Sequence, residues 1–560
     1  MILLDQKIIH WGTTSRLFLR QAYTLRVRGR SAFMKLLALV APSAALLVPA
    51  GSSGGRSGEA ARASVVRERL VATMNRRRFL IQAAGMVEAT VARSSLARAL
   101  QTVSSKPEVL VTLDPATTLA TIPSDFIGLG YEISSVSRPG FLSSQDSVYV
   151  QLVQTLGRQG VIRVGGNTSD YASYSARGEP LSSPEEKAGS VVNDSVLRDL
   201  GTFLEATGWK LIWGLNLGNG TQENAIQEAK AVTAAAKGNL LCFEIGNEPD
   251  LFARHAGFRK PGYAYDDYLR EYRACRDALE KAIPGIAFAG PDAAIATDWV
   301  TRFAADEGKD IKLLTHHYYR EGQNPTSTID KLLVVDPKLE STLAKLRAVS
   351  DSSSVPYRIC ETNSFSGGGR PGVSDTLGAA LWVLDFMFTL ASAGCAGVNM
   401  ETGVNQHGFI SSYSPIGDDE QGHFWAAPEY YGMLAFAQAG AGRIIASTVN
   451  AGGRNIKAYA TRSARELIVV TLINKQPSSD AVVVIKPVAD TGTFPAFQKS
   501  SLVRLSGPSL ESKSGVTLGG AGVSADGLWK AARIEEVSGV RGTLQVHLPA
   551  ASAAIVTLHS

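Results

Sequence analysis

Between about residue 126 and residue 401 the chain alternates between two hydrophobic patterns. Short apolar runs of strand length are separated by longer stretches in which apolar residues recur at helical spacing. The expected strands are residues 126–133, 161–165, 210–217, 240–245, 286–290, 312–319, 356–361 and 395–401. Eight strand–helix repeats of this size predict an α/β fold, a parallel (β/α)8 TIM barrel, with a doubly wound sheet as the structural alternative.

Helical spacing is clearest in five of the intervening stretches. These expected helices are residues 195–206, 221–236, 265–282, 330–349 and 374–393. Asn193 and Asp194 lie directly before the first of them, where a helix N-cap is expected.

After about residue 442 the pattern changes to short alternating strands separated by Gly, Pro, Ser and Asp. The expected strands are residues 455–460, 466–473, 481–486, 501–505, 532–535, 545–547 and 554–558. This spacing predicts a C-terminal antiparallel β-sandwich. We expect residues 108–120 to pair with it. The domains would then be a leader over residues 1–100, a barrel over 121–441, and a sandwich over 108–120 plus 442–560.

The charge of the chain is unevenly distributed. The whole sequence of 560 residues has a net charge of +5 and is 45% hydrophobic, as suits a globular protein. Residues 1–100 hold 16 Lys and Arg against 4 Asp and Glu, which leaves 40 against 47, a net of −7, in the rest. The basic character therefore belongs to the leader, which argues against a surface that binds nucleic acid or another polyanion.

The leader has the features of an export signal. Residues 74–80 place three consecutive arginines before the apolar stretch 81–91, and Ala97-Arg98-Ala99 follows. This order resembles a twin-arginine signal and predicts export to the periplasm or the medium, while the apolar stretch is too short for a stable membrane span. We interpret residues 1–73 as an extension upstream of a translation start at Met74, although the apolar run 36–50 is open to interpretation as a second signal or anchor.

The four cysteines, Cys242, Cys275, Cys360 and Cys395, have spacings that match no zinc motif. We interpret them as free thiols that pack as small apolar groups. The sequence predicts no metal and no organic cofactor.

Two acidic residues stand at the ends of expected strands. Asn247-Glu248-Pro249 follows the strand 240–245, and Glu361 ends the strand 356–361. Chemistry in a TIM barrel gathers at the carboxyl ends of the strands, so both side chains are expected at one cavity. Cleavage of a glycosidic bond needs such a pair, one carboxyl to protonate the leaving oxygen and one to meet the charge that develops on the sugar carbon. Asn247 is expected to hydrogen-bond the sugar 2-OH.

A third acid, Glu244, lies on the same face of the strand as Glu248. A buried charge needs a partner, so we expect Glu244 to form an ion pair with Arg163 or Arg358 rather than to act in catalysis.

Several runs of residues carry a family resemblance. Asn247-Glu248-Pro249 with Glu361 resembles the clan of retaining (β/α)8 glycosidases. The runs 162–170, 315–319 (Thr-His-His-Tyr-Tyr) and 361–364 (Glu-Thr-Asn-Ser) are similar to glycoside hydrolase family 79, which holds bacterial β-glucuronidases and heparanase. The resemblance extends over about residues 108–560.

The resemblance implies roles for individual residues. Glu248 would be the acid/base and Glu361 the nucleophile, with Tyr318 donating a hydrogen bond to Glu361. Further pocket residues implied by it are Glu132 and Asn167, which would line the sugar site, and His407 and Tyr413, which would cover it. Independently, the glycine-rich run that contains Gly367 is expected to offer backbone N–H groups to a sugar carboxylate.

We therefore expect a retaining glycoside hydrolase that cleaves β-glucuronides by double displacement. Open alternatives are a β-glucosidase, a hydrolase of 4-O-methylated or capped glucuronides, and a carbohydrate-binding protein without turnover. A polyanion-binding surface protein is the alternative from another class. The expected partner is a carbohydrate, with no nucleic acid.

Overall fold

The computed structural model describes residues 109–178, 189–254, 258–406, 411–440, 442–488, 499–540 and 542–559. These ranges belong to one compact unit, Ser104–Ser560. The expected leader and its export signal lie outside the described residues. Among the helices in the described ranges, none has the length and apolar character that crossing a bilayer requires.

Eight parallel strands close into a barrel, which confirms the predicted fold class over the doubly wound sheet. In order around the barrel they are β2 (Ile127–Glu132), β3 (Val161–Gly165), β6 (Lys210–Leu215), β7 (Leu240–Ile245), β8 (Phe288–Ala293), β9 (Ile311–Tyr319), β10 (Tyr357–Asn363) and β11 (Val398–Glu401). Each matches an expected strand. The largest difference is β8, which begins at Phe288 and continues through Pro291 to Ala293, beyond the expected end at residue 290.

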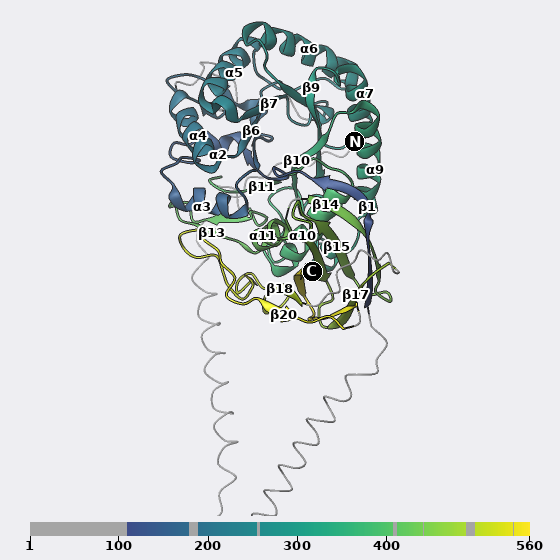
Figure 1. The fold of residues 1–560 in the computed structure, drawn as a ribbon. Helices are drawn as coiled ribbons and strands as arrows, with labels where there is room; N and C mark the ends of the chain where they lie inside the picture. Colours follow the sequence, from purple (N-terminus) through teal and green to yellow (C-terminus); the bar gives the residue numbers. More distant parts are fainter. Residues whose placement is uncertain are drawn as a thin grey trace, which may run out of the picture. The chain divides into compact units, whose positions relative to one another are not determined.

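Helices surround the barrel strands, as Figure 1 shows for α4 to α7 and α9. The helices are α2 (Ile133–Val136), α3 (Ser147–Leu156), α4 (Asp194–Thr207), α5 (Gln222–Ala236), α6 (Tyr265–Ala282), α7 (Thr297–Glu307), α8 (Ile329–Leu333), α9 (Pro337–Ser353), α10 (Leu377–Ser392) and α11 (Pro428–Ala439). Asn193 is the N-cap of α4, and its side chain accepts hydrogen bonds from the amides of Ser195 and Val196. The structure has two helices, α8 and α9, where one was expected over 330–349. The division occurs because Pro337 has no backbone N–H to donate within a helix and instead begins α9.

The C-terminal region forms one ten-stranded sheet. Its strands are β1 (Val109–Ile122), β14 (Gly442–Asn450), β15 (Ile456–Arg462), β16 (Ile468–Asn474), β17 (Ala481–Pro487), β18 (Lys499–Ser506), β19 (Thr517–Leu518), β20 (Glu535–Val537), β21 (Leu544–Leu548) and β22 (Ser552–His559). The inward residues of β1, β17 and β21 share a core with those of β15, β16 and β22, so the sheet folds over itself as a sandwich. Two small pairs complete the strands: β4 (Ser173–Tyr174) with β5 (Val191–Val192), and β12 (Ile416–Asp418) with β13 (Phe424–Ala426).

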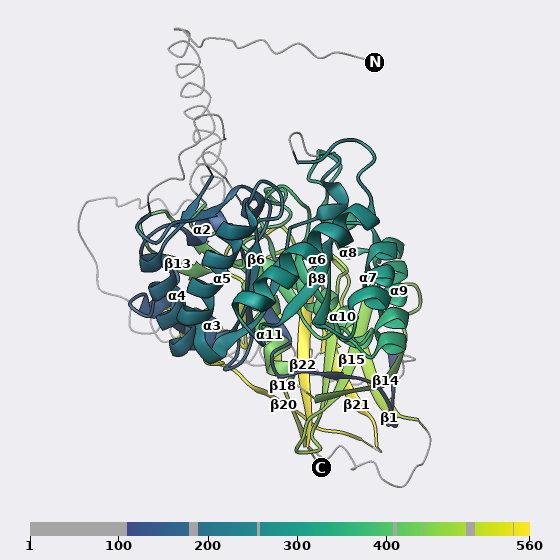
Figure 2. The same ribbon diagram turned by 90° about the horizontal axis from the view of Figure 1, so that it is seen from above.

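Strand β1 links the start of the described chain to the sandwich. It pairs antiparallel with β14 and parallel with β17. Figures 1 and 2 both show it beside the green strand β14. The predicted pairing of residues 108–120 with the sandwich is thus seen from Val109 onward, although the parallel ladder makes the sheet mixed rather than purely antiparallel.

The barrel and the sheet share a continuous apolar core. Helices α10 and α11 supply most of the contacts, and the ring of Phe388 on α10 stacks on Tyr459 of β15 at 4.8 Å between centroids. Next to them Lys475 forms an ion pair of 2.7 Å with Asp385. The two parts are therefore packed as one body.

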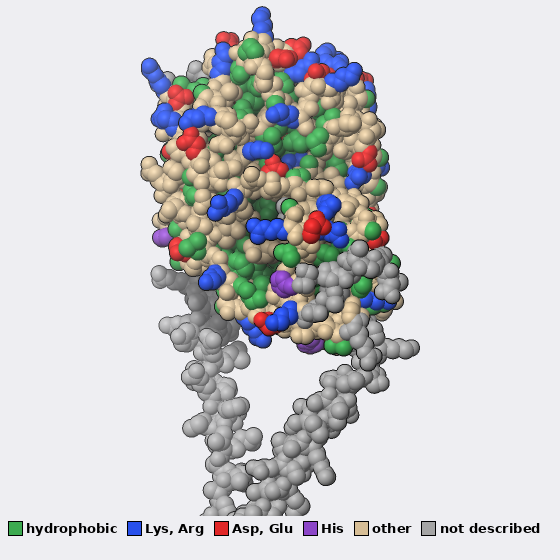
Figure 3. All heavy atoms as spheres, in the orientation of Figure 1, with side chains coloured by type: hydrophobic (Ala, Val, Ile, Leu, Met, Phe, Trp, Pro, Cys, Tyr) green, Lys and Arg blue, Asp and Glu red, His purple; other side chains and the backbone are tan. Residues whose placement is uncertain are grey.

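The face of the molecule shown in Figure 3 carries side chains of both charges. On this face, Asp and Glu side chains are interspersed with Lys and Arg.

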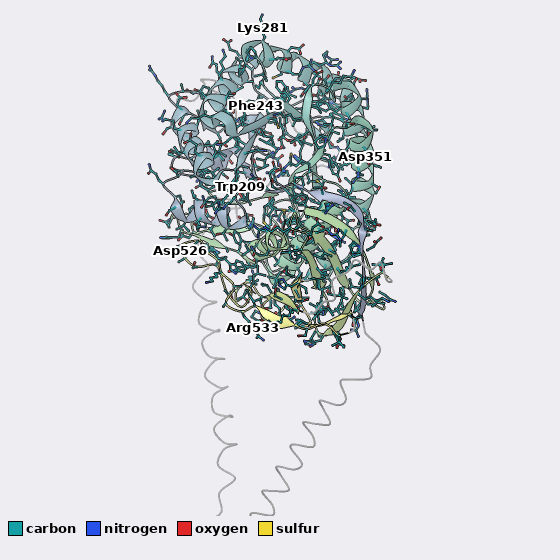
Figure 4. All side chains as sticks on the ribbon, viewed as in Figure 1. Trp209, Phe243, Lys281, Asp351, Asp526 and Arg533 are labelled. Carbon is teal, nitrogen blue, oxygen red and sulfur yellow. The ribbon has the colours of Figure 1, made fainter. Side chains whose placement is uncertain are left out.

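The inside of the barrel is closed at its base by small and branched apolar side chains. They are Val161, Ile212, Cys242, Ala289, Leu313 and Cys360, one from each of six consecutive strands. Phe243, labelled in Figure 4, alternates with Cys242 and belongs to the larger core outside the barrel. All four cysteines are buried free thiols, which confirms that prediction, and two of them fill this layer. The chemistry-bearing side chains begin directly above it.

Candidate active site

A cavity of about 660 Å³ opens at the carboxyl ends of the barrel strands. Of the residues predicted for the site, Glu132, Asn167, Glu248, Glu361, Gly367 and Tyr413 line it. Asn247 lies beneath its floor, only 2% exposed. Tyr318 does not line the cavity, and His407 lies outside the described residues.

The two predicted glutamates converge on this cavity from β7 and β10. A carboxylate oxygen of Glu248, a carboxylate oxygen of Glu361 and a ring nitrogen of His317 all lie within 4.8 Å of one another. The Glu248 side chain is 14% exposed and that of Glu361 is 6% exposed. Both carboxyl groups therefore reach the same small space while remaining largely shielded from solvent.

A β-bulge turns Glu361 toward the inside of the barrel. The register between β9 and β10 pairs Ile359 with His316 and then Glu361 with His317, so Cys360 is an extra residue. If the strand alternated regularly through Cys360, Glu361 would lie on the outer face with Ile359. The bulge thus places both Cys360 and Glu361 inside.

A second bulge occurs in β8. Pro291 pairs with Thr315 and Ala293 with His316, which leaves Asp292 as the extra residue, with a φ of 56°. Its carbonyl accepts a hydrogen bond from the amide of Glu248, 3.0 Å away. Asp292 therefore supports the turn after β7 as well as contributing its own carboxylate to the site.

Arg163 on β3 connects these acids. Its fully buried guanidinium donates to Glu244 at 3.1 Å, to Glu361 at 2.8 Å and to Asp292 at 2.6 Å. The predicted Arg163–Glu244 pair is confirmed, but we did not predict that the same arginine would contact Glu361. Gly165 makes the arrangement possible, because a Cβ there would lie 2.7 Å from Cζ of Arg163.

Asn247 is held from two sides. Its side-chain oxygen accepts a hydrogen bond from Arg163 at 2.8 Å, and its backbone amide donates to Asp170 at 3.1 Å. The side-chain amide nitrogen is 3.4 Å from Oδ1 of Asn167, which lines the cavity. The donor group of Asn247 is thereby directed toward Asn167 at the cavity wall.

His317 bridges two acids. Its Nδ1 is 3.0 Å from Glu248 and its Nε2 is 2.8 Å from Asp292. Burial alone would lower the pKa of His317, but the charges of Asp292 and Glu361 and its hydrogen bonds raise it well above its ordinary value. The charges of His317 and Arg163 overcome the effect of burial and lower the pKa of Asp292 to about 2. The imidazolium can then donate one hydrogen bond to the carboxyl group of Glu248 and one to the carboxylate of Asp292.

The environment of Glu248 favours its protonated form. Burial, supported by the negative charge of Glu361, raises the pKa of Glu248, although His317 opposes the shift. Deeper in the barrel, burial and the charge of Asp292 raise the pKa of Glu244 to about 7. Glu248 also has a φ of 51°, in the left-handed region that is uncommon for residues other than glycine.

The prediction that Tyr318 hydrogen-bonds the nucleophile is wrong. Its hydroxyl donates to Asp336 at 2.5 Å, and its ring stacks on Phe386 of α10. The neighbouring Tyr319 donates to Glu361 at 3.1 Å instead. Side chains alternate along β9, so His317 and Tyr319 face the barrel interior and Tyr318 faces the helices.

The opposite side of the cavity is lined by Glu132 and Asn167. Glu132 accepts hydrogen bonds from the amides of Asn167 and Thr168, at 3.2 Å and 2.8 Å. Burial and the charge of Glu361 raise its pKa to about 7. Tyr413 covers this region, and its ring stacks on Tyr319 at 6.3 Å.

Two groups of side chains have a spacing that a metal ion accepts, Glu248–His317–Glu361 and Glu244–Asp292–Cys360. In the first, both ring nitrogens of His317 already contact carboxylates, which leaves no free lone pair for a metal. In the second, burial raises the pKa of Cys360 well above its usual value, away from the thiolate that metals prefer. The donors of these residues fit a hydrogen-bonded ion-pair network.

Comparisons with known proteins agree with this fold. No protein-family profile matches the chain. A β-glucuronidase of Aspergillus niger is 28% identical over 373 residues, which cover 61% of this chain and 68% of that protein. A β-glucuronidase of Neurospora crassa is 30% identical over 339 residues, which cover 54% of this chain but only 59%, less than two thirds, of that protein.

Among solved structures, a 4-O-α-L-rhamnosyl-β-D-glucuronidase from Fusarium oxysporum is similar, with a TM-score of 0.63 and 20% identity. The alignment covers 80% of this chain and all of that one, which supports the barrel-and-sandwich fold. Together with the runs 162–170, 315–319 and 361–364, these similarities support the resemblance of the chain to the heparanase-like glycoside hydrolase family 79.

Proposed function

We propose that the protein is a retaining β-glucuronidase in which Glu361 is the nucleophile and Glu248 the acid/base. The observation that carries the proposal is the spacing of their carboxylate oxygens, within 4.8 Å. Retaining glycosidases hold the two carboxyl groups roughly 5–5.5 Å apart, whereas inverting enzymes need about 6.5–9.5 Å to admit a water molecule between them. The glucuronide specificity is supported by the names of the Aspergillus and Neurospora relatives.

In the first step, the Glu361 carboxylate attacks the anomeric carbon while the bond to the leaving oxygen breaks. Glu248 gives its proton to that oxygen, and an α-linked glycosyl ester of Glu361 forms. Arg163 and Tyr319 donate to the two oxygens of Glu361 and hold it in line for attack. Asn247 is available to bind the sugar 2-OH, a contact that strengthens as positive charge develops.

In the second step, Glu248 acts as base. Forming the ester removes the negative charge of Glu361, so the pKa of Glu248 falls. The Glu248 carboxylate then takes a proton from water, whose oxygen attacks the anomeric carbon and releases Glu361. Two inversions give a product with the β configuration of the substrate.

The sugar carboxylate needs a cationic or N–H donor in a cavity rich in acids. Arg138, after β2, lines the cavity, and no ion-pair partner is found for it among the described residues. Gly367 also lines the cavity, with a φ of 82° that favours glycine, and no acceptor for its amide is found in the same ranges. We assign these two groups to the uronate carboxylate.

A panel of aryl β-glycosides tests this function. The glucuronide is expected to have the highest kcat/KM among the glucuronide, glucoside, galactoside and xyloside, and proton NMR is expected to detect the β-anomer as the first product. A preference for the neutral glucoside would overturn the uronate assignment, and a first-formed α-anomer would overturn the mechanism.

Arg138→Gln is expected to lower kcat/KM for the glucuronide by about ten- to hundredfold, the range for losing a hydrogen bond to a charged group. The weaker activity on the glucoside should change less than about threefold, because a CH2OH group needs no cation. Arg370→Gln is the matched control, since Arg370 does not line the cavity. Equal losses on both sugars would argue against Arg138 as the uronate group.

The adjacent tyrosines of β9 provide a second comparison. Tyr319→Phe removes the donor to Glu361 and is expected to lower kcat/KM about ten- to hundredfold with little change in thermal midpoint. Tyr318→Phe removes the bond to Asp336, the N-cap of α9, so it should cost about 1 kcal/mol of stability and leave kcat/KM within about threefold. Kinetics and thermal unfolding of both variants measure the two effects, and the reverse assignment of losses would contradict the proposed roles.

We also propose that the protein is exported by the twin-arginine route, on the strength of Arg76 and Arg77 before the apolar stretch 81–91. Replacing both arginines by lysine is expected to retain the precursor in the cytoplasm. Unchanged export of this variant in cell fractionation would refute the route.

A further inference from the structure

One wall of the cavity is apolar. It is formed by Leu251, which follows β7, and by Ala294 and Ile295, which follow β8. Together these three residues are called the apolar wall below. Ile295 is 48% exposed, so a large aliphatic side chain borders open space in the same cavity as the Glu248 carboxyl group.

The apolar wall is rigidly connected to Glu248. Asp250, two residues after Glu248, accepts hydrogen bonds from the amides of Ala294, Ile295 and Ala296, at 2.8, 2.9 and 2.9 Å. Three backbone donors on one carboxylate tie the loop after β8 to the turn that carries Glu248. The exposure of Ile295 is thus built into the site and not a property of a loose loop.

Charged groups lie elsewhere around the cavity. Arg138 follows β2, and Glu321 and Lys338 follow β9. Two connecting segments contribute to this side of the cavity, one between β7 and α6 and one between β8 and α7. Among their described residues, Glu248 is the one with a polar side chain that lines the cavity. A charged or hydroxyl-rich group resting on this wall would lose hydrogen bonds to water without replacement.

We propose that the apolar wall is the aglycone subsite and that it takes a flat aromatic or polycyclic aglycone rather than a second sugar. This inference rests on the proposed function, because Glu248 must lie beside the leaving oxygen to protonate it. The aglycone is bonded to that oxygen, so its first ring falls on the surface next to Glu248. Covering Leu251 and Ile295 with a planar ring removes apolar area from water, which favours binding.

The test measures kcat/KM of the wild type and of one variant on each of two glucuronides. The ratio of variant to wild type is taken for each substrate separately, so the different reactivities of the leaving groups cancel. Ile295→Ser is expected to lower kcat/KM for 2-naphthyl β-D-glucuronide about five- to tenfold. For methyl β-D-glucuronide, whose aglycone is too small to cover the wall, the change should stay below about twofold. Because kcat/KM reports the first irreversible step, it includes aglycone binding.

Ile534→Ser is the matched control, since Ile534 is also exposed, at 61%, but belongs to the sandwich region. It should leave both substrates unchanged. Equal losses on naphthyl and methyl glucuronides, or a wild-type preference for a glucuronyl disaccharide over the naphthyl substrate, would overturn the aglycone assignment. If no glucuronide is cleaved, the proposed function fails. The aglycone assignment is then tested by the kcat/KM of Ile295→Ser relative to the wild type on the naphthyl and methyl forms of the glycoside that the enzyme does cleave.

Discussion

Glu361→Gln is expected to lower kcat/KM for the best aryl glycoside by at least about 10⁴-fold, because the amide cannot form the glycosyl ester on which both steps depend. The substitution keeps the size of the side chain. The amide oxygen can still accept from Arg163, and the amide NH2 can turn toward the oxygen of Tyr319. Thermal unfolding should therefore show a folded protein, and steady-state kinetics should show an almost inactive one.

A control for this result is available within the same cavity. Glu321 also lines it but forms an ion pair with Lys331, so Glu321→Gln should reduce kcat/KM less than about tenfold. Glu361→Ala with added azide should yield the α-glycosyl azide, because the anion replaces the missing nucleophile on the same face of the sugar. Activity of Glu361→Gln near the wild-type value, or a loss of equal size for Glu321→Gln, would remove Glu361 from the nucleophile role.

Glu248→Gln is expected to act selectively on the leaving group. For alkyl or sugar aglycones, which need protonation, kcat/KM should fall by about 10²–10⁴-fold, the usual contribution of general acid catalysis. For a dinitrophenyl glycoside, whose leaving oxygen needs no proton, the first step should be nearly unaffected. The ratio of the two losses, measured under kcat/KM conditions, separates acid catalysis from a simple defect in folding or binding.

The pH profile gives an independent test of the same residue. Glu248 is active in the first step while protonated, so wild-type kcat/KM should be high at low pH and decline as pH rises through the pKa of Glu248. Because burial and the charge of Glu361 raise that pKa, the decline should lie above the range of an ordinary glutamate. In Glu248→Gln this basic limb should disappear. Its persistence in the variant would assign the limb, and the acid role, to another group.

Several features could be predicted from the order of apolar and polar residues alone. Each barrel strand is a short apolar run, as expected for a parallel strand buried on both faces, and eight such runs separated by helical stretches predicted the barrel. The change to alternating strands after residue 442 predicted the sandwich. Glu248 and Glu361 were identifiable because each ends an apolar strand, and strand ends meet at one rim.

The contacts between site residues were less predictable. They depend on which face of a strand each side chain occupies, and a β-bulge reverses the order of faces along the strand. Tyr318 and Tyr319 are chemically alike in the sequence, and the register of β9 decides which of them meets Glu361. Asp292 was not predicted as a site residue, because the expected strand ends at residue 290 whereas β8 continues to Ala293. No local pattern marks Cys360 as a bulge, since the extra residue is defined only by pairing with β9.

The sequence by itself thus determined the barrel, the sandwich and the two strand-end glutamates, since these follow from hydrophobic burial and from the direction of parallel strands. Only the tertiary structure decided the network of Arg163, Asp292 and His317 that holds the two carboxyl groups. Those residues come from three strands that barrel closure brings together, while a bulge in β8 turns Asp292 and a bulge in β10 turns Glu361 toward the same point. Charge interactions and hydrogen bonds there depend on distances of a few ångströms between side chains on different strands. The order of residues along one strand does not specify those distances.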